Sequence, residues 1–478
     1  MTADLALPKS AQFIAHEIQA FRDEVRNLRV APTVSSAEIR QRLEPYTFAR
    51  QVPLTVALRD VADMLRHGTL HAAHPRYFGL FVPGVHEAGI WADALAALYN
   101  PQLGAWWHAP AANEIEIHTL KFLADVIGFE AHAAHFTSGG SEANLTALLA
   151  AVATAYPDAL EDGVGEGAAR GVVYVSSQAH HSMQKAVRIA GLGNRVLRVI
   201  PCNALHQMDI VALRETVETD VAAGRTPIMI VGTVGTTTAG AIDDLGAIGE
   251  VARTNAAWFH VDAAWGGAAG FSPLLRPHLR GINAADSVTW DAHKWLSVPM
   301  GAGMFFCRRP AVLRALFDVE AAYVPKKTDE GDDLYLMSLQ WSRRFIGLKV
   351  FLTLAAVGQG GVAARIERQL GVADYLRNRL TRAGWIIVNH SPLPLVCFTH
   401  SALKDRESIA DVARQVALGG RAWISEATLP EGPVLRACIT HDDSSTADVD
   451  VLCEELDRAL DPAIARSFTR DYRHIGRP

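Results

Sequence analysis

The stretch 285–307, ADSVTWDAHKWLSVPMGAGMFFC, carries a single lysine among mostly apolar and small residues. Asp291 and His293 come just before Lys294, and apolar residues on both sides predict strands at 286–290 and 303–307. Such a lysine either extends its amine to the surface along an apolar stem or is kept inside a site as a nucleophile. The stretch alone is compatible with both interpretations.

A second motif, HVDAAWGG at 260–267, lies upstream and favours the nucleophile. Asp262 follows a short apolar strand predicted at 258–261. A carboxylate at a strand end together with an enclosed lysine is what pyridoxal phosphate (PLP) requires. The lysine binds the cofactor aldehyde, and the carboxylate keeps the pyridine nitrogen protonated. The two motifs therefore predict a PLP site that contains Lys294 and Asp262.

A third motif, FTSGGSEAN at 136–144, predicts a turn that opens a helix. Glycines let the backbone approach a phosphate closely, and the free N–H groups of a first helical turn attract the anion. A glycine pair before a helix is about as often a packing turn. Because the lysine and the aspartate are also present, we assign Gly140 and Ser141 to the cofactor phosphate.

Short apolar segments alternate with helical patterns through the middle of the chain. This alternation predicts a mostly parallel sheet with helices on both faces, so functional residues should gather at the carboxyl ends of its strands. The expected strands are 134–137, 172–176, 228–232, 258–261, 286–290 and 303–307.

Taken together, HVDAAWGG, ADSVTWDAHKW and FTSGGSEAN resemble the PLP-dependent group II amino acid decarboxylases, which include aromatic amino acid, tyrosine and glutamate decarboxylases. The resemblance runs from His71 to Lys349 and returns at Leu435–Ile439. It implies the fold type I, aspartate aminotransferase-like α/β architecture with a smaller C-terminal α+β domain. The expected divisions are an N-terminal helical layer at 1–90, a large PLP-binding domain at 91–357 and a small domain at 358–478.

The resemblance also assigns roles to residues near these motifs. His180, after Gln178 and Ala179, would stack on the cofactor ring, and Tyr323 would protonate the substrate Cα. Asp291 stands where the family commonly has asparagine, and an anion beside a phosphate is unfavourable unless it is protonated or turned away. Further residues expected to contact the cofactor are Thr236, Ala264, Asp291 and His293.

The substrate is less clearly indicated. Tyr77, Phe81 and Trp106 favour an aromatic amino acid, whereas Arg436 favours an acidic one or belongs to a structural ion pair. In the family, the segment that matches Gly104–Ala112 comes from a neighbouring subunit. We therefore expect a homodimer with shared active sites.

Composition limits the remaining possibilities. The 478 residues carry a formal net charge of −6, which argues against nucleic acid as a partner. Five cysteines without a CxxC pair predict free thiols and no metal site. We find neither a signal-peptide pattern at the N-terminus nor a long uncharged apolar run, so we expect no membrane segment and a cytoplasmic location.

Other PLP enzymes with the same fold are the main alternative, either a carbon–carbon lyase or an aminotransferase. Their cofactor residues would look much the same, but the DAHKW motif and Tyr323 favour decarboxylation of an L-amino acid to the amine and CO2. A PLP-binding protein without catalytic activity is a remote third possibility.

Overall fold

The computed structural model describes residues 8–165, 167–319, 331 and 333–475. Contacts between residues divide the chain into two compact units. The central unit comprises Val85–Asp374 and Ile387–Cys397, and the terminal unit comprises Met1–Gly84, Tyr375–Ile386 and Phe398–Pro478. In this grouping, residues 8–84 belong with the C-terminal ones, and the expected division into three domains stays a prediction.

The central unit is built on a seven-stranded sheet of order β1-β7-β6-β5-β4-β2-β3. Adjacent strands are parallel from β6 through β5, β4 and β2 to β3, and β7 runs antiparallel to both β1 and β6. The predicted mostly parallel sheet is confirmed. The strands are β1 Ala133–Thr137, β2 Gly171–Ser176, β3 Leu197–Ile200, β4 Thr226–Thr233, β5 Trp258–Asp262, β6 Ser287–Asp291 and β7 Gly303–Cys307.

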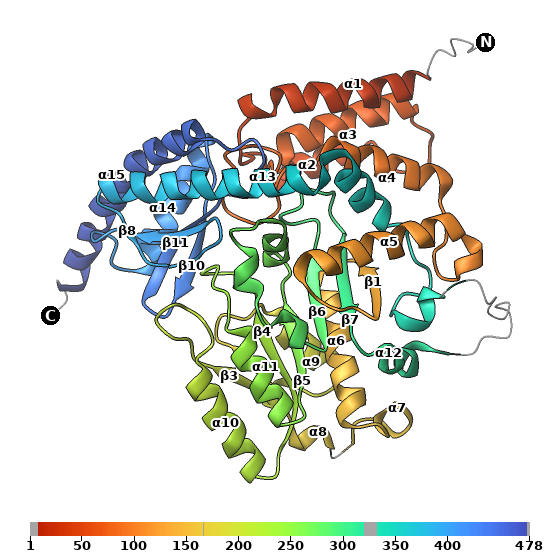
Figure 1. Ribbon diagram of the computed structural model, residues 1–478. Coiled ribbons are helices and arrows are strands. Elements are labelled where there is room, and N and C mark those ends of the chain that lie inside the picture. The colour runs from red at the N-terminus through yellow and green to blue at the C-terminus, as the bar shows by residue number, and fades with distance from the viewer. Residues whose placement is uncertain (1–7, 166, 320–330, 332, 476–478) are drawn as a thin grey trace. The chain divides into compact units, whose positions relative to one another are not determined.

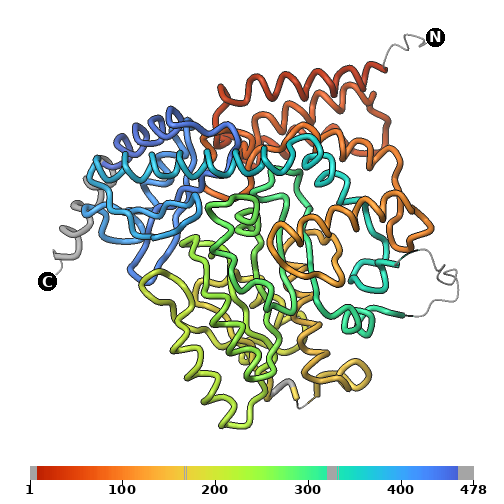
Figure 2. Tube along the Cα trace, in the orientation of Figure 1, coloured from red at the N-terminus to blue at the C-terminus, as the bar shows by residue number. Residues whose placement is uncertain are grey.

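Helices connect these strands, as expected for crossovers between parallel neighbours. In the Cα trace, residues 171–291, which run from β2 to β6, form the yellow-to-green part of the chain (Figure 2). The helices of this unit are α4 Glu87–Tyr99, α5 Pro110–Ile127, α6 Gly140–Ala155, α7 Ala159–Asp162, α8 Gly167–Arg170, α9 Ser182–Ile189, α10 Ile210–Ala222, α11 Leu245–Thr254 and α12 Pro310–Phe317 (Figure 1).

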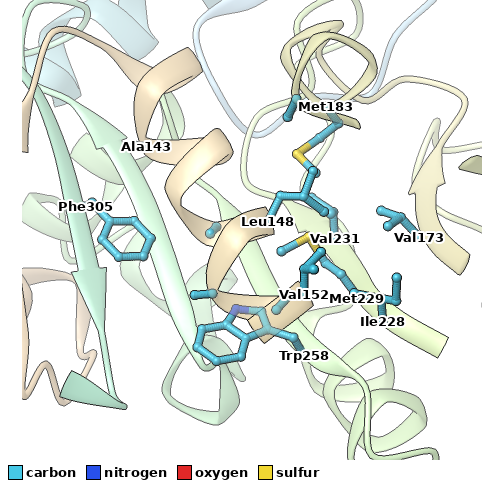
Figure 3. Close-up of a cluster of buried hydrophobic side chains, with 14 of the residues drawn as sticks. Ala143, Leu148, Val152, Val173, Met183, Ile228, Met229, Val231, Trp258 and Phe305 are labelled. Carbon is cyan, nitrogen blue, oxygen red and sulfur yellow. The ribbon is translucent and has the colours of Figure 1, made fainter. Parts of the chain in front are cut away.

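Strand alternation gives the two faces of β5 different neighbours. Phe259 points toward α11, where a Cβ at Gly249 would come within 3.1 Å of its ring. Trp258 points the other way into an apolar cluster with Leu148 and Val152 of α6 (Figure 3). His260 and Asp262 share the face of Trp258, because side chains two residues apart lie on the same side of a strand. Alanine-rich α6 therefore covers the face that carries Asp262.

The terminal unit contains helices from both ends of the sequence. A four-stranded sheet has the order β10-β11-β9-β8, and its β10 and β11 are antiparallel. The smaller C-terminal α+β domain implied by the resemblance is confirmed. The elements of the terminal unit are α1 Lys9–Glu24, α2 Ser36–Leu43, α3 Leu54–Gly68, α14 Arg406–Gly419, β10 Ser425–Leu429, β11 Gly432–Cys438 and α15 Thr446–Ile475, whereas β8 Ile386–Ile387 and β9 Leu395–Thr399 each cross a boundary between the two units.

One long helix, α13 (Gly347–Arg382), is broken at Gly358. The backbone there has φ 70° and ψ 160°, a left-handed conformation that glycine adopts without the strain a side chain would add. By length and composition alone, α13 is the one helix in the described part of the chain that could cross a membrane. The same test is also met by core helices, and the break divides α13 into two shorter segments.

A buried ion pair stabilises the start of α13. Arg343 Nη2 lies 3.0 Å from Glu116 Oε2 of α5, and the two side chains are 2% and 0% exposed. Glu116 also accepts the backbone N–H of Gly347, and Arg343 donates to the carbonyl of Leu103. Burial raises the pKa of Glu116, and the charge of Arg343 opposes this rise. The cation therefore compensates a carboxylate that water cannot reach.

We predict that Arg343→Met lowers the free energy of unfolding by about 3–5 kcal/mol, the usual cost of leaving one partner of a buried ion pair uncompensated. Denaturant-induced unfolding followed by circular dichroism measures this change. Arg344→Met is the matched control, because Arg344 is 66% exposed and lies 3.5 Å from Asp93. Its effect should stay within about 0.5 kcal/mol. Similar losses in both variants would contradict the prediction.

Candidate active site

Lys294 lies in the turn that follows β6. Its amine is 3.0 Å from Asp291 Oδ2, and its side chain is 22% exposed, so it is neither surface-exposed nor sealed. The turn is held by backbone bonds from Lys294 N to the Asp291 carbonyl and from Ser297 N to the Lys294 carbonyl. Ser297 has a left-handed φ of 58°, which is uncommon for a residue other than glycine. The lysine therefore occupies a constrained position with an anion beside it.

Asp262 ends the neighbouring strand β5. Its Oδ1 accepts the backbone N–H of Ala264 at 3.0 Å, and its Oδ2 accepts Nδ2 of Asn144 at 2.9 Å. The side chain is nearly buried. Each carboxylate oxygen has two lone pairs, so the group can still accept a further donor. The Asp291 N–H bonds to the Ala264 carbonyl, which joins the end of β6 to the chain just after Asp262.

The N-terminus of α6 approaches this edge of the sheet. The amides of Gly140 and Ser141 belong to its first turn, where no helical carbonyl is available to accept them. A Cβ at Gly140 would lie 3.0 Å from Asp291 Oδ2 and 3.4 Å from the Ala264 Cβ. Glycine therefore leaves a gap between the helix end, Asp291 and Ala264. Ser141 is exposed, whereas Gly140 is buried.

Two histidines lie close to these groups. The pKa of His180 is lowered chiefly by desolvation; Asp262 opposes the shift and Lys294 adds to it, so all three lie within electrostatic range. Part of the His180 ring remains exposed, and its Nδ1 accepts the N–H of Ser182. His293 is buried, and its Nδ1 accepts the N–H of Ala302. Burial also lowers the pKa of His293.

Thr236 follows β4 and is fully buried. Its hydroxyl accepts the N–H of Ala241 at 3.0 Å and so closes the turn that continues from β4. Nearby, the N–H of Val234 bonds to the carbonyl of Asp262. The hydrogen bond between Ala241 N–H and the Thr236 hydroxyl thus supports the loop beside Asp262.

Asp291 differs from the other site residues because one of its oxygens is unsatisfied. Its side chain is 2% exposed, and within the described chain Oδ1 is buried without a hydrogen-bond partner. Oδ2 faces Lys294, and His293 Nε2 is 3.8 Å away. A buried carboxylate oxygen normally finds a hydrogen-bond donor, so Oδ1 is open to a donor from a bound group. This aspartate is turned toward the lysine.

Three of the expected substrate residues, Tyr77, Phe81 and Arg436, belong to the terminal unit. Tyr77 stacks on Trp423 with ring centroids 5.0 Å apart. Arg436 is 4% exposed, donates to the Gly79 carbonyl at 2.7 Å and to Ser425 Oγ at 3.1 Å, and lies over the Phe81 ring at 5.1 Å. Its guanidinium is thus already bonded within its own unit.

The other two residues that the sequence singled out belong to the central unit or lie outside the description. Trp106 donates its indole N–H to Glu114 at 2.8 Å, and its backbone N–H bonds to Asp333. Tyr323 falls in 320–330, outside the described residues, and its role as proton donor stays a prediction.

A set of buried polar residues behind Asp262 was not expected from the sequence. Asn144, His260 and Ser287 bond to one another beneath α6. The spacing of Trp258, His260 and Asp262 along β5 is a signal for a shared face, but nothing in the sequence indicates that Asn144 reaches it.

These residues fit PLP. An amine, a nearly buried carboxylate with spare lone pairs, a partly exposed imidazole and a helix N-terminus with a gap at Gly140 all lie at one edge of the sheet. Their chemistry matches an aldehyde, a protonated ring nitrogen, a ring face and a phosphate, respectively. Asp291 Oδ1, which has no partner among the described residues, is open to a hydrogen-bond donor from a bound group.

Comparison with known proteins agrees with this fit. The family model described as "Pyridoxal-dependent decarboxylase conserved domain" matches residues 39–401. Tryptophan decarboxylase 1 of Oryza sativa subsp. japonica is 30% identical over 411 residues, which cover 82% of this chain and 79% of that protein. An acidic amino acid decarboxylase of Mus musculus is 27% identical over 411 residues, covering 82% and 74%.

A solved structure shares the fold across almost the whole chain. The crystal structure of Oryza sativa TDC with PLP and tryptamine has a TM-score of 0.90 and 25% sequence identity, and covers 97% of this chain and 100% of that one. The predicted fold class and cofactor are both confirmed. The chain belongs to the pyridoxal-dependent decarboxylase family and is a PLP-dependent amino acid decarboxylase.

Proposed function

We propose that Lys294 binds the PLP aldehyde, that Asp262 faces the pyridine nitrogen, and that His180 lies against the ring. Gly140 and Ser141 would hold the phosphate. The observation that carries this proposal is that Lys294 and Asp262 come together at the carboxyl ends of adjacent parallel strands. Ligands bind at that edge in open α/β sheets.

When bound, PLP accepts the electron pair that remains on the substrate Cα after the bond to the carboxylate breaks. The protein's tasks are to hold and orient. Asp262 would face the protonated ring nitrogen, because each of its oxygens is held by one N–H donor and can accept a further hydrogen bond. Asp262, His293 and Thr236 are themselves buried, so water has little access to these side chains.

The substrate we infer is an aromatic L-amino acid. The named relatives include enzymes for aromatic and for acidic substrates, so family membership does not decide the question. Arg436 is the residue that favoured an acidic substrate, and its donors already engage Gly79 and Ser425. An arginine so engaged is a poor candidate for binding a second carboxylate, and this favours the aromatic class.

We also infer a homodimer, on the basis of an apolar stripe along α4. Trp91, Leu95, Leu98 and Tyr99 are 42%, 42%, 74% and 78% exposed and recur at the spacing of one helix face. Apolar surface of this kind marks interaction sites. Trp107, in the segment Gly104–Ala112, is also 40% exposed and adds to the apolar surface available to a partner subunit.

A cytoplasmic location is the proposal that the cysteines support. All five are free, and four of them are buried. Unpaired thiols are typical of reducing compartments. Cell fractionation with an antibody to the protein tests this, and recovery in a secreted fraction would refute it.

We predict that Lys294→Ala abolishes both the visible absorption of the bound cofactor and amine release. In the wild type, borohydride should fix the cofactor on a peptide containing Lys294. Lys349→Met is a suitable control, because Lys349 is also nearly buried but bonds to the Met300 carbonyl and lies 3.5 Å from Asp93. Labelling at Lys349, or turnover by Lys294→Ala at the wild-type rate, would contradict the assignment.

Assayed for CO2 and amine against a panel of L-amino acids, the enzyme should favour tryptophan or tyrosine over glutamate by at least about tenfold in kcat/KM, equal to about 1.4 kcal/mol. Arg436→Met should lower stability without changing this preference, because it leaves the Gly79 carbonyl unbonded. Arg406→Met, at a 78% exposed arginine of the same unit, is the control. Preferential turnover of glutamate that disappears in Arg436→Met would overturn the aromatic proposal.

Replacing Leu98 by glutamate should weaken the dimer, because it places a charge in the middle of the apolar α4 stripe. Sedimentation velocity should then show a shift from dimer toward monomer as the protein is diluted. Val211→Glu changes a similarly exposed residue, 66% accessible on α10, and should remain dimeric. A wild-type protein that sediments as an active monomer would refute the dimer.

A further inference from the structure

A chain of hydrogen bonds runs behind Asp262 and connects β5, β6 and α6. Trp258 Nε1 donates to Ser287 Oγ at 2.8 Å, and Ser287 Oγ lies 2.8 Å from His260 Nδ1. His260 Nε2 lies 3.0 Å from Asn144 Oδ1, and Asn144 Nδ2 donates to Asp262 Oδ2 at 2.9 Å. The strand register explains the alignment, because His260 pairs with Ser287 and Asp262 pairs with Thr289.

Only one assignment of donors and acceptors satisfies all the hydrogen bonds in this series. With Ser287 donating to Nδ1, His260 carries its proton on Nε2 and donates to Asn144 Oδ1, which leaves the amide N–H groups for Asp262 and for Ser182 Oγ. With the proton on Nδ1 instead, Nε2 would be an acceptor. Asn144 would then have to turn its own oxygen toward Asp262, and two acceptors would face each other.

The environment favours the same arrangement. Trp258, Asn144, His260 and Ser287 are each at most 2% exposed, so water does not compete for these bonds. Burial lowers the pKa of His260 to about 4, against the opposing charge of Asp262, which keeps the imidazole neutral with one proton. Thr289 Oγ1, 3.4 Å from His260 Nε2, can serve as a weaker second acceptor. Hydrogen bonds in such surroundings are stronger than in water.

We propose that Asn144 is the positioning residue for Asp262, and that Trp258, Ser287 and His260 fix the direction in which its amide points. The Asn144 N–H holds Oδ2 of Asp262 as an acceptor, while the Ala264 N–H holds Oδ1. A carboxylate fixed as an acceptor at both oxygens does not take the proton from the group that it faces. This inference rests on the proposed placement of Asp262 at the pyridine nitrogen and extends it to residues that do not touch the cofactor.

The test compares Asn144→Leu, Ser287→Ala and the double variant in the PLP-loaded enzyme. Asn144→Leu should lower kcat by about ten- to a hundredfold, the effect of losing one hydrogen bond to a charged group. KM should change by less than about twofold, since the loss affects the transition state rather than binding. The visible absorption band of the bound cofactor should also move, because the ring nitrogen shares its proton differently once Asp262 is released.

Ser287→Ala is the smaller change and guards against a folding failure. It should reduce kcat in the same direction but less, and it should add nothing when Asn144 is already leucine, because linked positions are not additive. Ser272→Ala is the matched control, a fully buried serine of the same unit that bonds to Glu367. It should leave kcat and the absorption band unchanged.

Two outcomes would contradict the positioning role of Asn144 and its hydrogen-bonded neighbours. One is additive losses in the double variant, and the other is an absorption band that stays in place in Asn144→Leu. Asp262→Asn separates this failure from failure of the proposed function. If Asp262→Asn loses activity while Asn144→Leu and Ser287→Ala behave as wild type, only the positioning role of Asn144 is wrong. If Asp262→Asn keeps the wild-type rate, the role of Asp262 is wrong as well.

Discussion

The pairing of β5 with β6 is the constraint on which the candidate site depends. These parallel neighbours bring Asp262 and Asp291 to the same edge, and two further bonds extend the ladder: Ala263 N to the Thr289 carbonyl and Asp291 N to the Ala264 carbonyl. A shift of one residue would turn every side chain of a strand to the opposite face. The lysine and the aspartate can therefore serve one cofactor only in this register, and the apolar packing beneath α6 fixes it.

Asp291 shows how this register creates an electrostatic problem as well as a site. An asparagine there could donate to a phosphate at the α6 N-terminus, whereas an ionised aspartate cannot. The structure gives one oxygen to Lys294 at 3.0 Å and leaves the other without a partner among the described residues. The carboxylate therefore balances the lysine charge, and Gly140 provides the space between them and the helix end. In the proposed arrangement, phosphate binding at this corner would fall mainly to the backbone amides.

The parts of the candidate site that the sequence indicates are those whose signals are local. Lys294 follows an apolar strand, Asp262 ends one, and Gly140 begins a helix, so each motif indicates both a residue and its position in an element. The half-exposed β3 and the polar β10 lack a continuous apolar pattern and were missed. Asn144 could not be found in this way, because its role exists only where α6 crosses β5. The role of Arg436 was ambiguous from the sequence. The carbonyl that accepts its hydrogen bond belongs to Gly79, which lies far away in the sequence.

The polar chain behind Asp262 also bears on why α6 is so rich in alanine. Ala143, Ala147 and Ala151 are all at most 1% exposed, and small side chains allow the helix to pack close to the sheet. A close helix can place Asn144 within hydrogen-bond distance of both His260 and Asp262, whereas larger residues would push it away. The close packing of α6 also keeps water from the hydrogen bonds behind Asp262, so each bond lies in a medium of low dielectric. The same packing forms the apolar core and fixes the direction of the hydrogen bonds. The rigid contact between α6 and the sheet therefore holds the carboxylate of Asp262 in one orientation.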